Sequence, residues 1–243
     1  MTIRRLCKFV GIYSASLRQV SPHRILLLLY CRSSQGLTYA NGTLWESNGL
    51  YGHSTVRILD PDTANVIKSV DMPATLFGEG MAYAHGKLYQ ITWKSQQGFV
   101  YNATTLDVIE QFEFHTTRGE GWGITWDPCQ KEFIVTDGSE FLHFWDKDTL
   151  AQSRKIPVRR RNGDPIRGLN EIEWYRGKVL ANVWYQDVLL VIDPATGIIE
   201  KEYGTQQNHP ISLSVSMQHH VEISHCSSFY RHRFQCSLPK TRA

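Results

Sequence analysis

The stretch Gln35-Gly36-Leu37-Thr38-Tyr39 begins a pattern that occurs four times along the chain. The later copies are Glu79-Gly80-Met81-Ala82-Tyr83, Trp122-Gly123-Ile124-Thr125-Trp126 and Asn170-Glu171-Ile172-Glu173-Trp174. Successive copies begin 44, 43 and 48 residues apart. A period of forty-odd residues is typical of one propeller blade, a four-stranded antiparallel sheet that must stack against its neighbours to bury both faces. The sequence therefore predicts an all-β fold, a β-propeller of which four blades are recognisable.

Turn signals recur in step with this pattern. Tight hairpin turns are predicted at Asn41-Gly42, His85-Gly86 and Arg176-Gly177, because Asn-Gly and related pairs accept positive φ. A second marker predicts a turn whose first side chain caps the backbone that follows. Its four copies are Asp60-Pro61-Asp62-Thr63, Asn102-Ala103-Thr104-Thr105, Asp146-Lys147-Asp148-Thr149 and Asp193-Pro194-Ala195-Thr196. The predicted blades are residues 34–72, 78–116, 121–158 and 168–203.

The two ends of the chain do not follow the repeat. Residues 1–33 have no period and are expected to be irregular, and the His- and Ser-rich residues 205–243 are expected to be disordered. A zinc site in this tail is the less favoured alternative, because the spacing of its His and Cys residues matches no standard zinc finger. The apolar run from Ile25 to Cys31 is too short to span a bilayer. It is only weakly similar to the apolar region of a signal peptide, so the compartment is left open.

Charge and cysteine content exclude two other classes of protein. The 243 residues have a formal net charge of +3. The basic excess lies at the ends, because residues 35–203 carry 16 Lys or Arg and 22 Asp or Glu, so the repeats are not expected to bind nucleic acid. Five widely spaced cysteines without a CxxC motif indicate neither a disulfide framework nor a zinc ribbon. No metal or other cofactor is predicted.

The first residues of the four copies, which we call the opening residues, are Gln35, Glu79, Trp122 and Asn170. The first strand of every propeller blade lines the central channel, so these four residues are expected to face one another at one mouth of it. Trp93 and Trp184 end the second strands of their repeats and should lie at the same rim. Polar groups surrounded by aromatic side chains are the usual composition of a binding pocket.

Each of these residues also has a purely structural interpretation. Glu79 lies between glycines and could be a solvated loop acid. Any one of the tryptophans could serve only to pack the blades, and Asn170 could cap a turn. The convergence of all of them on one rim favours the functional interpretation.

Several motifs together resemble the plant and bacterial type of glutaminyl cyclase, in order from about Gln35 to Gly204. They are Ser34-Gln35-Gly36-Leu37, Tyr51-Gly52-x-Ser54-x-Val56-Arg57, Phe77-Gly78-Glu79-Gly80, Leu88 to Trp93 with Gly98-Phe99-x-Tyr101, Gly121-Trp122-Gly123-Ile124-Thr125, Asp137-Gly138-Ser139, Leu169-Asn170-Glu171-Ile172-Glu173 and Ala181-Asn182-Val183-Trp184. The resemblance implies a five-bladed propeller that needs no catalytic metal. It also implies conversion of the N-terminal glutamine of peptides or proteins to pyroglutamate, with release of ammonia.

The resemblance implies a role for each site residue. Glu79 would act as the general base and then the general acid, and Asn170 would orient the reacting groups. Gln35 would form a hydrogen bond with the substrate. Aromatic walls would come from Phe77, Trp93, Trp122 and Trp184. A secretory or extracellular, monomeric enzyme is the corresponding expectation.

One part of the family pattern has no match in this chain. The family has a fifth repeat with a Gly-Lys-x-Trp-Pro segment that carries an essential lysine, and Lys240, in Pro239-Lys240-Thr241, does not fit it. Two alternatives follow. The chain could be a catalytically impaired propeller that still binds peptide N-termini, or its two ends could stem from an alternative or mis-joined reading of the gene.

Overall fold

A computed structural model describes residues 34–204, and within this range every regular element is a β-strand. Sixteen strands form four sheets of four. The first sheet contains β1 (Ser34–Ala40), β2 (Thr43–Asn48), β3 (Thr55–Leu59) and β4 (Val66–Asp71). The second contains β5 (Gly78–Ala84), β6 (Lys87–Thr92), β7 (Gln97–Asn102) and β8 (Val108–Glu113). The third contains β9 (Ile124–Asp127), β10 (Glu132–Val135), β11 (Phe141–Asp146) and β12 (Gln152–Pro157). The fourth contains β13 (Leu169–Tyr175), β14 (Lys178–Val183), β15 (Val188–Ile192) and β16 (Ile199–Gly204).

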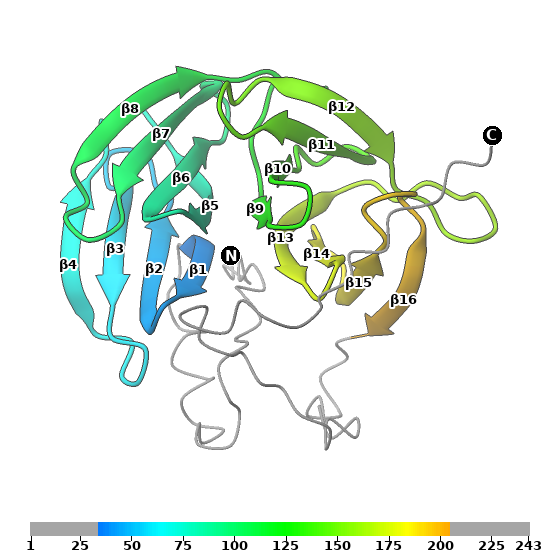
Figure 1. The fold of residues 1–243 in the computed structure, drawn as a ribbon, viewed down its shortest axis with the longest axis horizontal. Coiled ribbons are helices and arrows are strands. Elements are labelled where there is room, and N and C mark those ends of the chain that lie inside the picture. The colour runs from blue at the N-terminus through cyan, green and yellow to red at the C-terminus, as the bar shows by residue number, and fades with distance from the viewer. Residues whose placement is uncertain (1–33, 205–243) are drawn as a thin grey trace, which may run out of the picture.

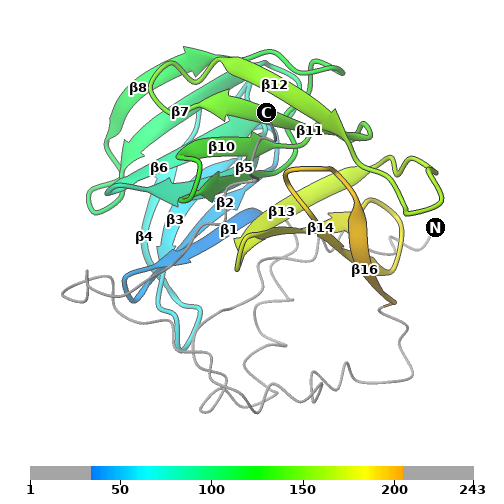
Figure 2. The ribbon, with the colours of Figure 1, turned by 45° about the vertical axis from the view of Figure 1, so that its right-hand side comes forward.

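Each sheet is an antiparallel meander whose strands pair in the order of the sequence. Figure 1 shows the four sheets around a common centre, with β1, β5, β9 and β13 innermost and β4, β8, β12 and β16 at the periphery. The first and fourth sheets lie at the two ends of this arc, and Figure 2 shows the same arrangement turned by 45°. The predicted all-β fold with four propeller blades is confirmed. The expectations for residues 1–33, including the run at Ile25 to Cys31, and for residues 205–243, including Lys240, lie outside the described residues.

The predicted turns have the local geometry that their residues favour. Asn41 and Gly42 have φ of 51° and 80°, and the pairs His85-Gly86 and Arg176-Gly177 have nearly the same values. Two consecutive positive φ values match the twist of the flanking strands in a two-residue hairpin. At the second marker, Asp60 Oδ1 accepts hydrogen bonds from the backbone N–H groups of Asp62 and Thr63. These markers are therefore structural turns, as predicted.

Apolar clusters fill the spaces between neighbouring sheets. One cluster, around Met81 and Leu88, joins the first and second sheets; another, around Phe133 and Trp145, joins the second and third. A third cluster joins the third and fourth sheets and includes Phe144, Leu169 and Leu190. Burial against the next blade thus supplies the core that a single four-stranded sheet lacks. In the described part of the chain, no helix exists that could cross a membrane.

Candidate functional site

Three of the four opening residues lie at irregularities of the innermost strands. In β1, Ser34 pairs with Asn48 and Gly36 with Ser47, so Gln35 is an extra residue relative to β2. The register shifts by one residue in the same way between Gly78 and Met81, around Glu79, and between Leu169 and Ile172, around Asn170. These shifts have the residue count of β-bulges, which redirect side chains and are common beside active sites. Gln35, Glu79 and Asn170, whose side chains could bind or react with a substrate, therefore all lie at bulges of the innermost strands.

Glycines let the innermost strands approach one another closely. A Cβ on Gly36 would lie 2.5 Å from the backbone N of Met81, and a Cβ on Gly80 would lie 2.8 Å from the Trp122 carbonyl oxygen. The Gly80 N–H also donates to that oxygen at 2.9 Å, which links β5 to the segment just before β9. Gly123 approaches Asn170 similarly, because its Cβ would meet the Asn170 carbonyl oxygen at 2.4 Å. The backbones of the four opening residues are thus neighbours in the predicted order around the centre.

The polar opening residues are buried. Glu79 is 4% exposed, Gln35 is 9% exposed and Asn170 is fully buried. Neither side-chain polar atom of Asn170 has a hydrogen-bond partner within the described protein, and Gln35 Oε1 also has none. Unpaired buried carboxamides cost free energy, and such groups in a folded protein call for an explanation. Both carboxamides therefore have hydrogen-bonding capacity that the described residues do not use.

The four predicted aromatic residues Phe77, Trp93, Trp122 and Trp184, which we call the aromatic wall, are all half-buried. Phe77 and Trp93 make an edge contact with ring centroids 5.6 Å apart, and Trp122 and Trp184 make a similar one at 5.7 Å. The two pairs come from different sheets. The structure therefore places each predicted aromatic residue in contact with another, next to the buried polar groups.

One acid that joins the two aromatic pairs was not predicted from the sequence. Glu120 Oε2 accepts hydrogen bonds from Trp93 Nε1 at 2.9 Å and from Trp122 Nε1 at 2.8 Å. The available signal was a second Gly-Glu-Gly triplet, residues 119–121, which repeats the triplet around Glu79. Tyr51 and Tyr185 were also missed; they contact Phe77 and Trp184 at the outer ends of the wall.

A buried carboxylate, that of Asp137, fixes the loop that carries Glu120. Asp137 and His143 are both fully buried, and His143 Nε2 lies 3.3 Å from Asp137 Oδ2. The same carboxyl oxygen accepts the backbone N–H of Arg118 at 2.8 Å. Burial by itself would raise the pKa of Asp137, but interactions with His143, Ser139 and the Arg118 backbone outweigh it and lower the pKa to about 2. Asp137 therefore stays ionised and holds the loop at every pH at which the protein would be assayed.

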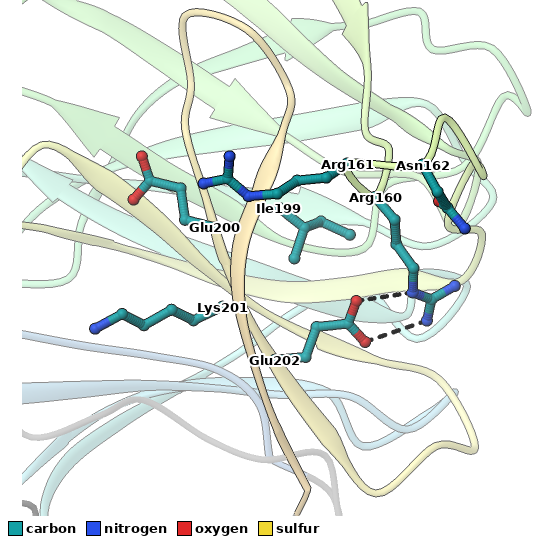
Figure 3. Close-up of a pocket in the computed structure, with 7 residues that line it drawn as sticks. All are labelled: Arg160, Arg161, Asn162, Ile199, Glu200, Lys201 and Glu202. Carbon is teal, nitrogen blue, oxygen red and sulfur yellow. Dashed lines mark hydrogen bonds and ion pairs between the residues drawn. The ribbon is translucent and has the colours of Figure 1, made fainter.

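A surface hollow of about 300 Å³ lies elsewhere, between the loop that connects the third and fourth sheets and strand β16 (Figure 3). The Arg160 guanidinium forms two hydrogen bonds with the Glu202 carboxylate across it. Because none of the predicted site residues lines this hollow, we assign it no part in the site.

Among the described residues no cluster of three or more His, Cys, Asp or Glu side chains is arranged to hold a metal ion.

Glu173, in the inner strand β13, makes a pH-dependent contribution to stability. It is only partly exposed, and desolvation of its carboxyl group raises its pKa to about 8 from an ordinary value near 4.5. Between these two pH values the folded protein binds a proton that the unfolded chain has released, so stability falls as pH rises. Since water still reaches part of the side chain, we expect a total loss of about 2 to 4 kcal/mol, below the full linkage value.

Replacement of this acid should remove that pH dependence. We expect Glu173→Gln to match the wild type in urea unfolding at pH 4.5 and to exceed it by about 2 kcal/mol or more at pH 8.5. The comparison is made between variant and wild type at each pH, so other titrating groups cancel. Equal differences in unfolding free energy at the two pH values would contradict a raised pKa for Glu173.

Comparison with known proteins identifies the family of this chain. The sequence model of the glutamine cyclotransferase family matches residues 30–215. The chain is 39% identical over 165 residues to a glutaminyl-peptide cyclotransferase of Arabidopsis thaliana; the match covers 68% of this chain and 50% of that protein. The structure is similar to that of glutaminyl cyclase from Myxococcus xanthus, with a TM-score of 0.62, 29% identity and 71% of each chain covered. The chain thus spans about half the length of its plant relative. It belongs to the glutamine cyclotransferase family.

Proposed function

We propose that this protein converts the N-terminal glutamine of peptides or proteins to pyroglutamate and releases ammonia, with Glu79 as the group that carries the proton. Family membership supports the reaction class. The observation that carries the proposal is the fully buried Asn170, whose carboxamide has no hydrogen-bond partner among residues 34–204. It lies at a bulge of the inner strands, in the same ring as the buried Glu79.

The chemistry requires one proton carrier and a fixed substrate geometry. The neutral α-amine attacks the γ-carbonyl carbon of its own residue, and a C–N bond forms as Glu79 takes a proton from that amine. Glu79 then returns the proton to the γ-nitrogen, the original C–NH₂ bond breaks, and ammonia leaves. No co-reactant is needed, because the reaction exchanges one amide bond for another.

The other residues of the site would fix the substrate in the reactive conformation. Asn170 can both donate and accept a hydrogen bond, so it suits a carboxamide or an amine, and Gln35 offers a further acceptor. The aromatic wall would enclose the glutamine side chain and exclude water. Orientation of two groups within one molecule is an effective way to lower such a barrier.

The direct test is ammonia release from a Gln-initiated peptide by the full chain. We expect turnover above the spontaneous rate in buffer, and none with the same peptide acetylated at its α-amine. Peptide mass should fall by one ammonia per turnover. Binding of the Gln-initiated peptide without conversion, by a folded sample, would overturn the enzymatic proposal and support the alternative of a peptide-binding propeller.

A further inference from the structure

We propose that Glu120 is a positioning residue for this reaction: its carboxylate holds the indoles of Trp93 and Trp122 in the orientation that forms the aromatic wall. This inference rests on the proposed function. Both indole N–H groups donate to the same oxygen, Oε2, at 2.9 and 2.8 Å. An indole N–H has no other polar atom to offer, so this one bond fixes the rotation of each ring.

Glu120 connects two blades that share no strand pairing. Trp93 follows β6 of the second sheet, and Trp122 precedes β9 of the third. The Gly121 N–H also donates to the Trp93 carbonyl oxygen at 2.8 Å, so backbone and side chains of the two segments are joined at adjacent points. The distance between the Trp93 and Trp122 parts of the aromatic wall is therefore fixed by Glu120 as well as by packing between the blades.

The backbone of Glu120 is held firmly enough for this role. Thr116 Oγ1 accepts the Glu120 N–H at 3.1 Å and donates to the Glu120 carbonyl oxygen at 2.8 Å. Two residues before Glu120, the Arg118 N–H is bound by the buried Asp137 carboxylate. Hydrogen bonds thus hold the loop both before and after Glu120. The Glu120 carboxylate is therefore pre-organised in the absence of substrate.

To position the two indoles, the side chain at residue 120 needs a hydrogen-bond acceptor but no negative charge. A carboxamide oxygen has two lone pairs and can accept both indole N–H groups, so Glu120→Gln preserves the geometry and removes the charge. Glu120→Ala removes the carboxylate oxygen to which both indoles donate. The two variants therefore separate positioning of the wall from direct recognition of the substrate's ammonium group, which would need the negative charge.

The experiment combines kinetics with a signal that does not depend on turnover. We expect Glu120→Ala to raise KM for a Gln-initiated peptide about tenfold or more, since loss of hydrogen bonds to a charged acceptor is worth at least that factor. Glu120→Gln should stay within about threefold of the wild type, which is less than the effect of one such bond. The exposed Glu113 on β8 supplies the control, and Glu113→Ala should leave KM unchanged.

The second readout is the set of indole N–H resonances in protein labelled with ¹⁵N at tryptophan. Two of them, assigned with Trp93→Phe and Trp122→Phe, should shift together in Glu120→Ala and remain close to their native positions in Glu120→Gln. Unshifted resonances in Glu120→Ala, or a Glu120→Gln variant as defective in KM as Glu120→Ala, would overturn the proposal. If the wild type proves inactive, the resonances still test whether Glu120 holds the two indoles. Failure of the positioning role is therefore distinguishable from failure of the proposed function.

Discussion

Glu79→Gln should reduce the rate of pyroglutamate formation by about a thousandfold, in the range that loss of a general acid–base residue produces. The amide cannot accept the proton of the attacking amine or return it to the departing nitrogen. Glutamine has nearly the same shape, and Glu79 is 4% exposed within a strand held by pairing to β6, so the fold should survive the change. The measurement is steady-state ammonia release from a Gln-initiated peptide, with kcat and KM determined separately.

The fall should appear mainly in kcat, because the aromatic wall and the carboxamides that would bind the substrate are unchanged. Glu113→Gln, a change of the same kind at an exposed position of β8, serves as the matched control and should have wild-type kinetics. Residual activity of Glu79→Gln above one-tenth of the wild-type rate would assign the proton transfer to another group. Unfolding of both variants by urea checks that neither effect is a loss of structure.

The parts of this molecule that depend on local chemistry could be predicted from the sequence. The positive φ of Asn41 and Gly42 follows from their residue types, and so does the cap formed by Asp60. The repeat also predicted which strands would line the centre, because the first strand of each blade has that place in a propeller. The neighbours of the opening residues therefore followed from the phase of the repeat.

Features that depend on contacts between blades could not be predicted in this way. The hydrogen bond from Trp93 to Glu120 joins residues 27 positions apart, and no pattern within a single repeat specifies it. The bulges at Glu79 and Asn170 also have no residue signature of their own, since each is a one-residue mismatch with the partner strand. Single-sequence periodicity locates a side chain on a strand, but it does not give the register of that strand with its neighbour.

The close approach of the innermost strands makes Gly123 a position where even one methyl group should be highly destabilising. A Cβ there would lie 2.4 Å from the Asn170 carbonyl oxygen and 2.9 Å from the Glu171 Cα. Both are backbone atoms of β13, so no side-chain rotation can relieve the overlap. The fourth sheet would have to move away from the third. The Thr136 hydroxyl, which donates to that same carbonyl oxygen, would lose its present geometry.

We therefore expect Gly123→Ala to lower the free energy of unfolding by about 3 kcal/mol or more, at the upper end of the cost of overpacking, because backbone must shift. Urea unfolding measures this directly. Gly204→Ala is the matched control, since a Cβ at Gly204 meets no atom of the described residues within 4 Å, and it should unfold like the wild type. Under conditions where Gly123→Ala stays folded, displacement of β13 should also move Asn170 relative to Glu79, so kcat/KM should fall further than the folded fraction. Wild-type stability of Gly123→Ala would contradict the close contact between Gly123 and the backbone of β13.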